Sequence, residues 1–279
     1  MPRHVRIAIC QFASEQPAEG SVQSNFKRLE SFISSAASDN ANLIVFPEYF
    51  LTGIISEHLH LASEEGDWIQ ELKLLAKHYK IDVVAGTVVE KSAKNAEHLF
   101  NTARYIDKNG NVLGEYQKKH LWHPEKEYLQ NATEEHQVFN TDLFKAGLLI
   151  CWDMAWPEAF RALLRQGVEV VIVPAYWTVD EVISDHDPVG TAEKAWLDSL
   201  LITRAYENEC CVIFVNCAGP KEQGFLGRSG VALPFKGAVA HIESCNEMMK
   251  LVDVDLDILE HARKAYKIKE DLETYYPER

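Results

Sequence analysis

Short apolar runs with the period of β-strands alternate with amphipathic helical segments along almost the whole of the 279-residue chain. The first run covers residues 4–12, where Val5, Ile7 and Ile9 alternate with other side chains, as in a strand with one strongly buried face. Residues 21–38 follow, and their apolar side chains recur on one face of a helix. This alternation predicts an α/β protein in which helices cover the faces of sheets.

The same two periodicities predict the remaining elements. Strands are expected at residues 43–46, 82–89, 145–150, 168–173, 211–215, 229–233, 238–242 and 249–254, helices at 68–79, 157–166 and 191–207, and a hairpin at 101–116. The Asn109-Gly110 pair is expected to supply the positive φ angles of the hairpin turn. Because late hairpins follow earlier β-α units, the pattern indicates a four-layer α-β-β-α sandwich with mixed sheets. No linker-like segment interrupts it, so a single domain over residues 1–279 is predicted.

The charge balance of the chain is acidic, with 28 Lys and Arg against 42 Asp and Glu and a formal net charge of -14. Nucleic acids and anionic membranes are bound through clustered basic side chains, so neither is an expected partner. The sequence contains no apolar run of about 18 residues and no pattern typical of a signal peptide at its start. A cytoplasmic location is therefore expected.

Cysteine and histidine spacings give no sign of a disulfide framework or of a metal site. Six cysteines are too sparse for a disulfide scaffold in a chain of this length. No C-x-x-C or H-E-x-x-H motif occurs, and the nearest approach to a ligand cluster is Asp185-His186-Asp187, which we interpret as a solvated polar loop. We expect no metal and no organic cofactor.

Two reactive side chains directly follow predicted strands, where parallel sheets present functional groups. Glu48 comes after the strand at residues 43–46, and its aromatic neighbours imply burial, which raises a carboxyl pKa. Cys151 ends the strand at residues 145–150, ahead of the helix that opens near Pro157. A thiol that faces a helix N-terminus ionises more easily, although a lone cysteine on an apolar strand is more often inert core.

A pair of lysines, Lys118 and Lys119, follows the predicted hairpin directly. Such a pair is either a solvated rim or contains one lysine that turns inward to stabilise negative charge on a substrate oxygen. Spacing alone leaves the choice between the two lysines open.

Three segments of the chain carry a resemblance to a known family: Phe46-Pro47-Glu48, residues 116–121 (YQKKHL) and residues 150–158 (ICWDMAWPE). In order and separation they resemble the signature blocks of the nitrilase superfamily, the carbon-nitrogen hydrolases. The resemblance extends through residues 101–103, 161–174 and 204–208, so it covers most of the chain. It implies a nitrilase-type sandwich that forms a homodimer or higher homo-oligomer, with the helix near residues 158–166 and the tail at about 256–279 in the contacts.

The resemblance also implies a catalytic triad of Glu48, Lys118 and Cys151, and it selects Lys118 over Lys119. A second glutamate matches Glu125, with Glu127 as the competing position. In this scheme the thiol attacks a carbonyl carbon, Glu48 transfers the proton, and Lys118 with the backbone N–H of Trp152 holds the oxyanion. Water then releases the acid from a thioester.

The same segments indicate the substrate class. They most resemble amidases and N-carbamoyl amine hydrolases, which cleave a linear amide or a carbamoyl group. Relatives that act on N-carbamoyl amino acids tend to carry an arginine soon after the cysteine, where this chain has Met154 and Ala155, so an α-carboxylate substrate is not expected. Hydrolysis of a nitrile is the alternative within the family, and a catalytically silent binding scaffold is the alternative of another class.

Aromatic side chains gather in the segments that surround the expected site. We predict that they wall a pocket for the small-molecule substrate. The predicted lining residues are Tyr49, Trp122, Trp152, Trp156 and Trp177.

Overall fold

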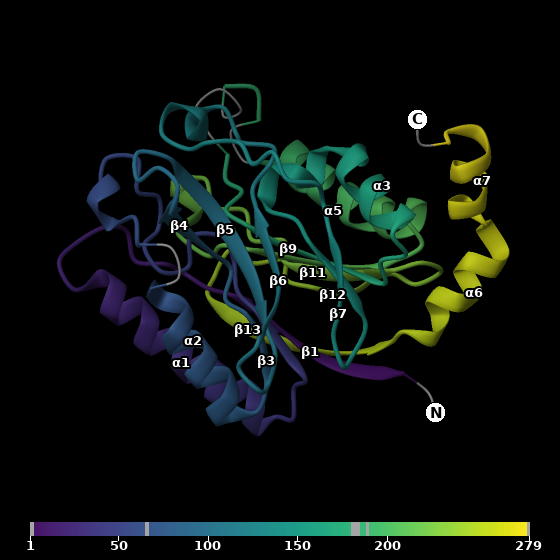
Figure 1. Cartoon of the computed structure of the whole chain (residues 1–279), viewed down its shortest axis with the longest axis horizontal. Helices are drawn as coiled ribbons and strands as arrows, with labels where there is room; N and C mark the ends of the chain where they lie inside the picture. Colours follow the sequence, from purple (N-terminus) through teal and green to yellow (C-terminus); the bar gives the residue numbers. More distant parts are fainter. Residues whose placement is uncertain (1–2, 65–66, 180–184, 188–189, 278–279) are drawn as a thin grey trace.

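Two β-sheets pack face to face between two pairs of helices in the computed structural model of the chain, which describes residues 3–64, 67–179, 185–187 and 190–277 (Figure 1). Helices α1 (Ser21–Ser38) and α2 (Asp67–Tyr79) cover one outer face, and α3 (Pro157–Arg165) and α5 (Thr191–Glu207) cover the other (Figure 1). The predicted four-layer α-β-β-α sandwich is therefore confirmed. Among the described residues, no helix is long and apolar enough to cross a bilayer.

The first sheet has seven strands in the order β13-β1-β2-β3-β5-β4, and β6 pairs with β5. β1 lies next to the edge strand β13, with which it pairs in antiparallel orientation, and it pairs with β2 in parallel. The strands are β1 (His4–Gln11), β2 (Leu43–Val45), β3 (Asp82–Val84), β4 (Thr87–Lys91), β5 (Leu99–Ile106), β6 (Val112–Gln117) and β13 (Met248–Asp255). The sheet is mixed, as expected from the combination of hairpins with β-α units.

The second sheet has six strands in the order β12-β11-β10-β9-β8-β7, in which the neighbouring strands β8, β9 and β10 run parallel. The strands are β7 (Val138–Asn140), β8 (Lys145–Leu148), β9 (Val170–Ala175), β10 (Cys211–Asn216), β11 (Gly230–Leu233) and β12 (Gly237–His241). Apolar side chains of the two sheets interlock between them, among them the fully buried Ile7, Val171 and Ile213. β7 was not predicted, because three half-buried or exposed residues carry too little periodicity.

The strand predicted at residues 82–89 is wrong, since the chain turns at Gly86 and forms β3 and β4 instead. Gly86 has a φ of +67°, and a Cβ at this position would lie 1.7 Å from the backbone oxygen of Pro47. Only glycine allows this close approach. The turn therefore packs directly against the residue that precedes Glu48.

The hairpin between β5 and β6 closes through a five-residue loop rather than through the tight turn predicted at Asn109-Gly110. Only Gly110 of that pair has a positive φ, of +82°. The carboxylate of Asp107 accepts the backbone N–H groups of Asn109 and Asn111 at 2.9 and 2.7 Å. The Asp107 side chain therefore stabilises the loop through hydrogen bonds to its backbone. Asn109 does not adopt the positive φ angle that a two-residue turn would require.

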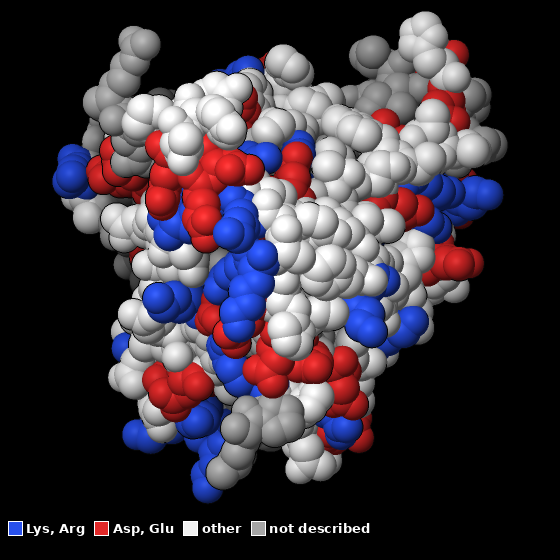
Figure 2. Space-filling view, turned by 90° about the vertical axis from the view of Figure 1, so that its right-hand side faces the viewer, with Lys and Arg blue, Asp and Glu red and all other residues white. Residues whose placement is uncertain are grey.

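The C-terminal part of the chain forms α6 (Asp257–Tyr266) and α7 (Ile268–Tyr275), which run along the edge of the molecule beside α3 (Figure 1). The Arg165 guanidinium of α3 donates to the backbone oxygen of Tyr276 at 2.7 Å. On the molecular face that carries this edge, a narrow run of basic side chains crosses the middle of the view, with acidic side chains beside it (Figure 2).

We predict that Gly86→Ala destabilises the protein by at least about 3 kcal/mol, because it combines a left-handed backbone with a clash against backbone rather than against a movable side chain. Gly20→Ala is the matched control. Gly20 has a φ of +80° but no atom within 4 Å of an added Cβ, so its loss should stay near about 1 kcal/mol. Urea unfolding measures both, and equal losses would contradict the role given to the contact with Pro47.

Candidate active site

Three chain segments bring a carboxylate, an ammonium and a thiol to one end of the two sheets. Glu48 follows β2, Lys118 follows β6 of the same sheet, and Cys151 follows β8 of the other sheet. All three line one pocket. The site is therefore built at the junction of the two sheets, and neither sheet holds it alone.

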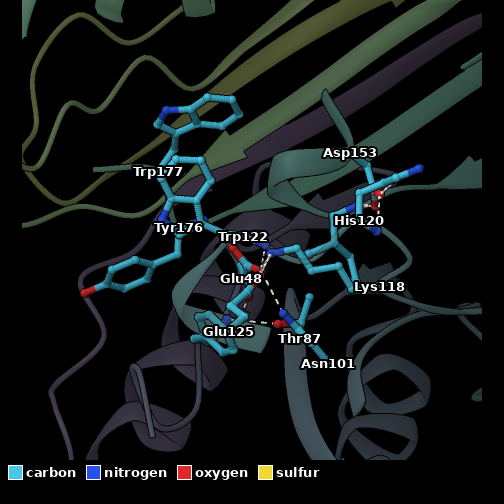
Figure 3. Close-up of polar contacts among 12 residues, drawn as sticks. Glu48, Thr87, Asn101, Lys118, His120, Trp122, Glu125, Asp153, Tyr176 and Trp177 are labelled. Atoms are coloured by element: carbon cyan, nitrogen blue, oxygen red, sulfur yellow. Dashed lines mark hydrogen bonds and ion pairs between the residues drawn. The ribbon is translucent and has the colours of Figure 1, made fainter. Parts of the chain in front are cut away.

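The ammonium group of Lys118 lies between two carboxylates (Figure 3). Its Nζ donates to Glu48 Oε1 and to Glu125 Oε1, each at 2.8 Å, and its side chain is 0% exposed. Glu48 is held further by Asn101 Nδ2 on Oε1 at 2.7 Å and by the backbone N–H of Tyr176 on Oε2 at 2.8 Å. These donors fix the position of the Glu48 carboxylate.

Of the two candidates for a second glutamate, the structure brings Glu125 into the site. Glu125 is buried in the short helix η2 (Pro124–Glu127), where it accepts the backbone N–H of Trp122 at 2.7 Å and the hydroxyl of Tyr49. Glu127, two residues on, is exposed. Lys119 likewise turns away, and its Nζ donates to the backbone oxygen of Glu134 at 3.1 Å.

Cys151 occupies a strained position at the start of η3 (Cys151–Ala155), with a φ of +46°. A non-glycine residue in the left-handed region is held there by its surroundings and is common at functional sites. The helix that directly adjoins the thiol is this short turn, whereas α3 begins only at Pro157. The sharp turn presents Cys151 to the pocket, although the residue is only 7% exposed.

Burial and the neighbouring charges shift the pKa values of these groups. Burial raises the pKa of Glu48, the charge of Lys118 lowers it, and the charge of Glu125 raises it again, with a net rise. Burial raises the pKa of the Cys151 thiol as well, and the Glu48 charge adds to the rise. Burial alone would lower the pKa of Lys118, but the charges of Glu48, Cys151 and Glu125 raise it above its ordinary value. The resting site thus favours a charged ammonium beside a neutral thiol, which needs a base before it can attack.

The pocket above these groups has a volume of about 470 Å³, and many of its lining residues are aromatic. Of the predicted lining residues, it brings together Tyr49, Trp122, Trp152 and Trp177. The prediction that Trp156 lines it is wrong: that ring is 41% exposed and stacks on His120 with centroids 4.5 Å apart, outside the pocket. Lining residues that the sequence analysis missed are Ile54, Ser56, Pro124, Tyr128, Tyr176, Thr178, Glu193 and Trp196.

The missed residues come from segments that the motifs do not cover. Glu193 and Trp196 lie in the first turns of α5, and Tyr176 directly follows β9. The one signal that could have found Tyr176 is its place just beyond the end of a parallel strand. Nothing in the helical pattern of α5 distinguishes Trp196 from a helix residue on the outer surface.

The fully buried carboxylate of Asp153 joins the lysine segment to the cysteine turn (Figure 3). Its Oδ1 accepts the ring Nδ1 of His120 at 2.6 Å and the backbone N–H of His120 at 3.2 Å. Its Oδ2 accepts the hydroxyl of Tyr116 at 2.9 Å and the backbone N–H of Ile150 at 2.8 Å. One side chain therefore ties together the segments that carry Lys118 and Cys151. Lys118 lies two residues from both Tyr116 and His120, and Cys151 directly follows Ile150.

Within the described residues, His120, His136 and Asp153 form the group whose ligand atoms lie close enough to hold a metal ion, within 4.8 Å of one another. Both Asp153 oxygens already accept two hydrogen bonds each, so the group serves as a hydrogen-bonded brace. In the loop at residues 185–187, the Asp187 carboxylate instead accepts the first backbone N–H groups of α5. Residues 180–184, 188 and 189 of the same loop lie outside the described residues.

Comparison with known proteins identifies the family of the chain. The family model of the carbon-nitrogen hydrolases matches residues 6–263. The chain belongs to the carbon-nitrogen hydrolase family. This match confirms the resemblance to the nitrilase superfamily that the three motifs carry.

Two curated relatives of this carbon-nitrogen hydrolase are amidases. The 2-oxoglutaramate amidase of Bacillus subtilis is 33% identical over 257 residues, which cover 91% of this chain and 93% of that protein. An (R)-stereoselective amidase of a Pseudomonas species is 29% identical, with 96% and 91% covered. Among solved structures, Nit3 of Saccharomyces cerevisiae, a member of branch 10 of the nitrilase superfamily, has the same fold, with a TM-score of 0.81 at 24% identity and 95% and 94% of the chains covered.

We predict that Asp153→Asn lowers the free energy of unfolding by about 3 kcal/mol. Both carboxylate oxygens of Asp153 accept hydrogen bonds, whereas the asparagine amide replaces one of them by an NH₂ group, which would face donors with a donor. The control is Asp142→Asn. The Asp142 carboxylate, 72% exposed, pairs with Lys108 at the surface, so its loss should stay below about 1 kcal/mol. Guanidinium unfolding followed by tryptophan fluorescence measures both, and a small effect at Asp153 would show that the brace is dispensable.

Proposed function

We propose that this protein hydrolyses the carbon-nitrogen bond of a linear amide or an N-carbamoyl amine, and that it releases the acid and ammonia or an amine through a thioester on Cys151. One observation carries the proposal. The Lys118 ammonium, fully buried between Glu48 and Glu125, lies at the pocket that Cys151 also lines. A buried charge with two partners of this kind suits the stabilisation of a developing oxyanion.

In the first half of the reaction, Glu48 takes the thiol proton of Cys151 and the sulfur attacks the carbonyl carbon of the substrate. The pKa of Glu48 is raised, so it lies closer to the pKa values of the thiol and of the leaving nitrogen, with which Glu48 exchanges protons. Lys118 Nζ and the backbone N–H of Trp152 stabilise the oxyanion. Glu48 then donates the proton to the departing nitrogen as the carbon-nitrogen bond breaks, which leaves a thioester.

In the second half, Glu48 takes a proton from water, and the hydroxide oxygen attacks the thioester carbon. The carbon-sulfur bond breaks, the acid leaves, and the proton returns to Cys151. Glu125 holds Lys118 from the opposite side and positions the water or the substrate amide. Glu48, Lys118, Glu125 and Cys151 interact closely. An apparent pKa of the site therefore describes these four groups together.

The two relatives that are amidases support an amide as the substrate class. Hydrolysis of a nitrile would use the same nucleophile, so product analysis has to separate the two. The intact set of Glu48, Lys118 and Cys151, which line one pocket, argues against a silent scaffold.

The family resemblance supports a homodimer or a higher homo-oligomer as part of this proposal. Along the tail at about 256–279, Tyr266, Tyr275 and Tyr276 are 41%, 72% and 70% exposed. Aromatic side chains with this exposure are enriched where subunits meet. The neighbouring helix α3 is the second expected contact region.

We predict that Cys151→Ala abolishes the release of ammonia from a panel of aliphatic amides, N-carbamoyl amines and nitriles, and that Glu48→Gln slows it by about 10²- to 10⁴-fold. Cys245→Ser is the control, because Cys245 is half-buried and does not line the pocket. Circular dichroism checks that each variant is folded. Appreciable turnover by folded Cys151→Ala would exclude the thioester, and a wild type inactive on the whole panel would favour the scaffold.

We predict that kcat/KM for an amide falls on the acid side with an apparent pKa above 4.5, the ordinary value for glutamic acid, because protonated Glu48 no longer accepts the thiol proton. Glu125→Gln removes a charge that raises the pKa of Glu48, so it should move this acid limb to lower pH. Glu127→Gln, an exposed neighbour, should leave the limb in place. A pH-rate series on the three proteins measures the shift, and movement in the opposite direction would contradict the assignment of Glu48 as the base.

A further inference from the structure

The pocket has an excess of negative charge among its described lining residues. Three carboxylates, those of Glu48, Glu125 and Glu193, face one ammonium, that of Lys118. Lys118 already donates to two of the carboxylates, and no arginine, histidine or second lysine is found among these lining residues. The described part of the wall therefore offers no cationic side chain to the far end of a substrate.

The other source of positive potential near the pocket is the N-terminus of α5, whose first turns contribute Glu193 and Trp196 to the wall. A carboxylate of the chain already occupies it. Asp187 accepts the backbone N–H groups of Thr191, Ala192 and Glu193 at 2.8, 2.7 and 3.0 Å. A carboxylate on a substrate would have to displace Asp187 before it could use this helix end.

The wall that faces the substrate is made of four neighbouring indole rings. The Trp152 ring lies at the centre, with ring centroids 4.5 Å from Trp122, 5.3 Å from Trp177 and 6.0 Å from Trp196. Indole faces carry negative charge, and indole is the aromatic group that attracts a cation most strongly. The wall is apolar toward a hydrocarbon chain and attractive toward an ammonium group.

Glu193 adds a full negative charge to this wall. Its Oε1 accepts the indole N–H of Trp177 at 2.7 Å, so the carboxylate is held beside the ring rather than turned into bulk water. The residue is half-buried, which strengthens its interaction with a charge that enters the pocket. A substrate carboxylate at the same depth would lose its hydration next to a like charge.

We propose that the pocket selects a substrate whose far end is a cationic amine, joined by an apolar spacer to the scissile amide or carbamoyl group, with Glu193 and Trp196 as specificity determinants. This inference rests on the proposed function. A volume of about 470 Å³ leaves room for such a chain beyond the reacting carbonyl. Substrates with a distal carboxylate are excluded by the same charges, which separates this chain from an amidase that acts on a dicarboxylate-derived amide.

The test compares three amides of matched length: 4-aminobutanamide (cationic), pentanamide (neutral) and glutaramate (anionic). We expect kcat/KM to decrease in that order, with at least about 100-fold between the cation and the anion. Glu193→Gln should reduce the cation-to-anion ratio at least about tenfold, while its amide oxygen can still accept the Trp177 N–H. Glu127→Gln, which removes the same charge from an exposed site outside the pocket lining, should leave the ratio within about twofold.

Trp196→Leu is the second variant, which keeps an apolar side chain and removes the π face. Trp196 is 38% exposed, so this change should not prevent folding. It should lower kcat/KM for 4-aminobutanamide more than for pentanamide. Equal losses on the two amides would remove Trp196 from the inference.

Binding to the Cys151→Ala variant separates this inference from the proposed function. Isothermal titration of that variant with the three amides should give the same order of affinity without turnover. If this order appears while the wild type hydrolyses none of them, the proposed function fails and the pocket selectivity stands. If the wild type hydrolyses glutaramate as well as 4-aminobutanamide, if Glu193→Gln leaves the ratio unchanged, or if the variant binds none of the three, the inference is overturned.

Discussion

The buried ammonium of Lys118 between the carboxylates of Glu48 and Glu125 is the interaction on which the rest of the site depends. Charges this deep are stable only when partners surround them in good geometry, and the loss of one partner leaves an uncompensated charge. Lys118 follows β6, its partners Glu48 and Glu125 follow β2 and lie in η2, respectively, and Cys151 follows β8 of the opposite sheet. The face-to-face packing of the two sheets therefore brings these side chains together. The loop after β6 carries both Lys118 and Glu125, whereas Glu48 and Cys151 come from two other segments.

Two further features keep this assembly in register. Gly86 lets the turn between β3 and β4 approach the backbone oxygen of Pro47, which leads the chain into Glu48. Asp153 bonds at once to the segment that carries Lys118 and to the turn that carries Cys151. The left-handed backbone of Cys151 is tolerated because these contacts determine the turn from both sides. The aromatic residues of the pocket lie beside these charged groups and lower the polarity around them, so that their charges interact strongly.

Much of the fold was predictable because its signals are local. Periodicity located α1 and α5 with their observed bounds, and it placed Glu48 and Cys151 just beyond two strands. The errors arose where a distant contact overrides a local pattern. The run at residues 82–89 breaks because Gly86 meets Pro47, and the Trp156 ring leaves the pocket because it stacks on His120. Neither contact can be recognised from the residues that neighbour it in the sequence.

By itself, the sequence determined the class of fold and, through three motifs, the family, and it predicted Glu48, Lys118 and Cys151 as the site residues. Such motifs are contiguous, so they can be recognised without knowledge of how the chain closes. Only the tertiary structure decided between Glu125 and Glu127, and only it brought Glu193 and Trp196 to the wall beside Trp177. Burial and charge at a pocket are sums over residues far apart in the chain, and their positions follow from how the two sheets and α5 pack together.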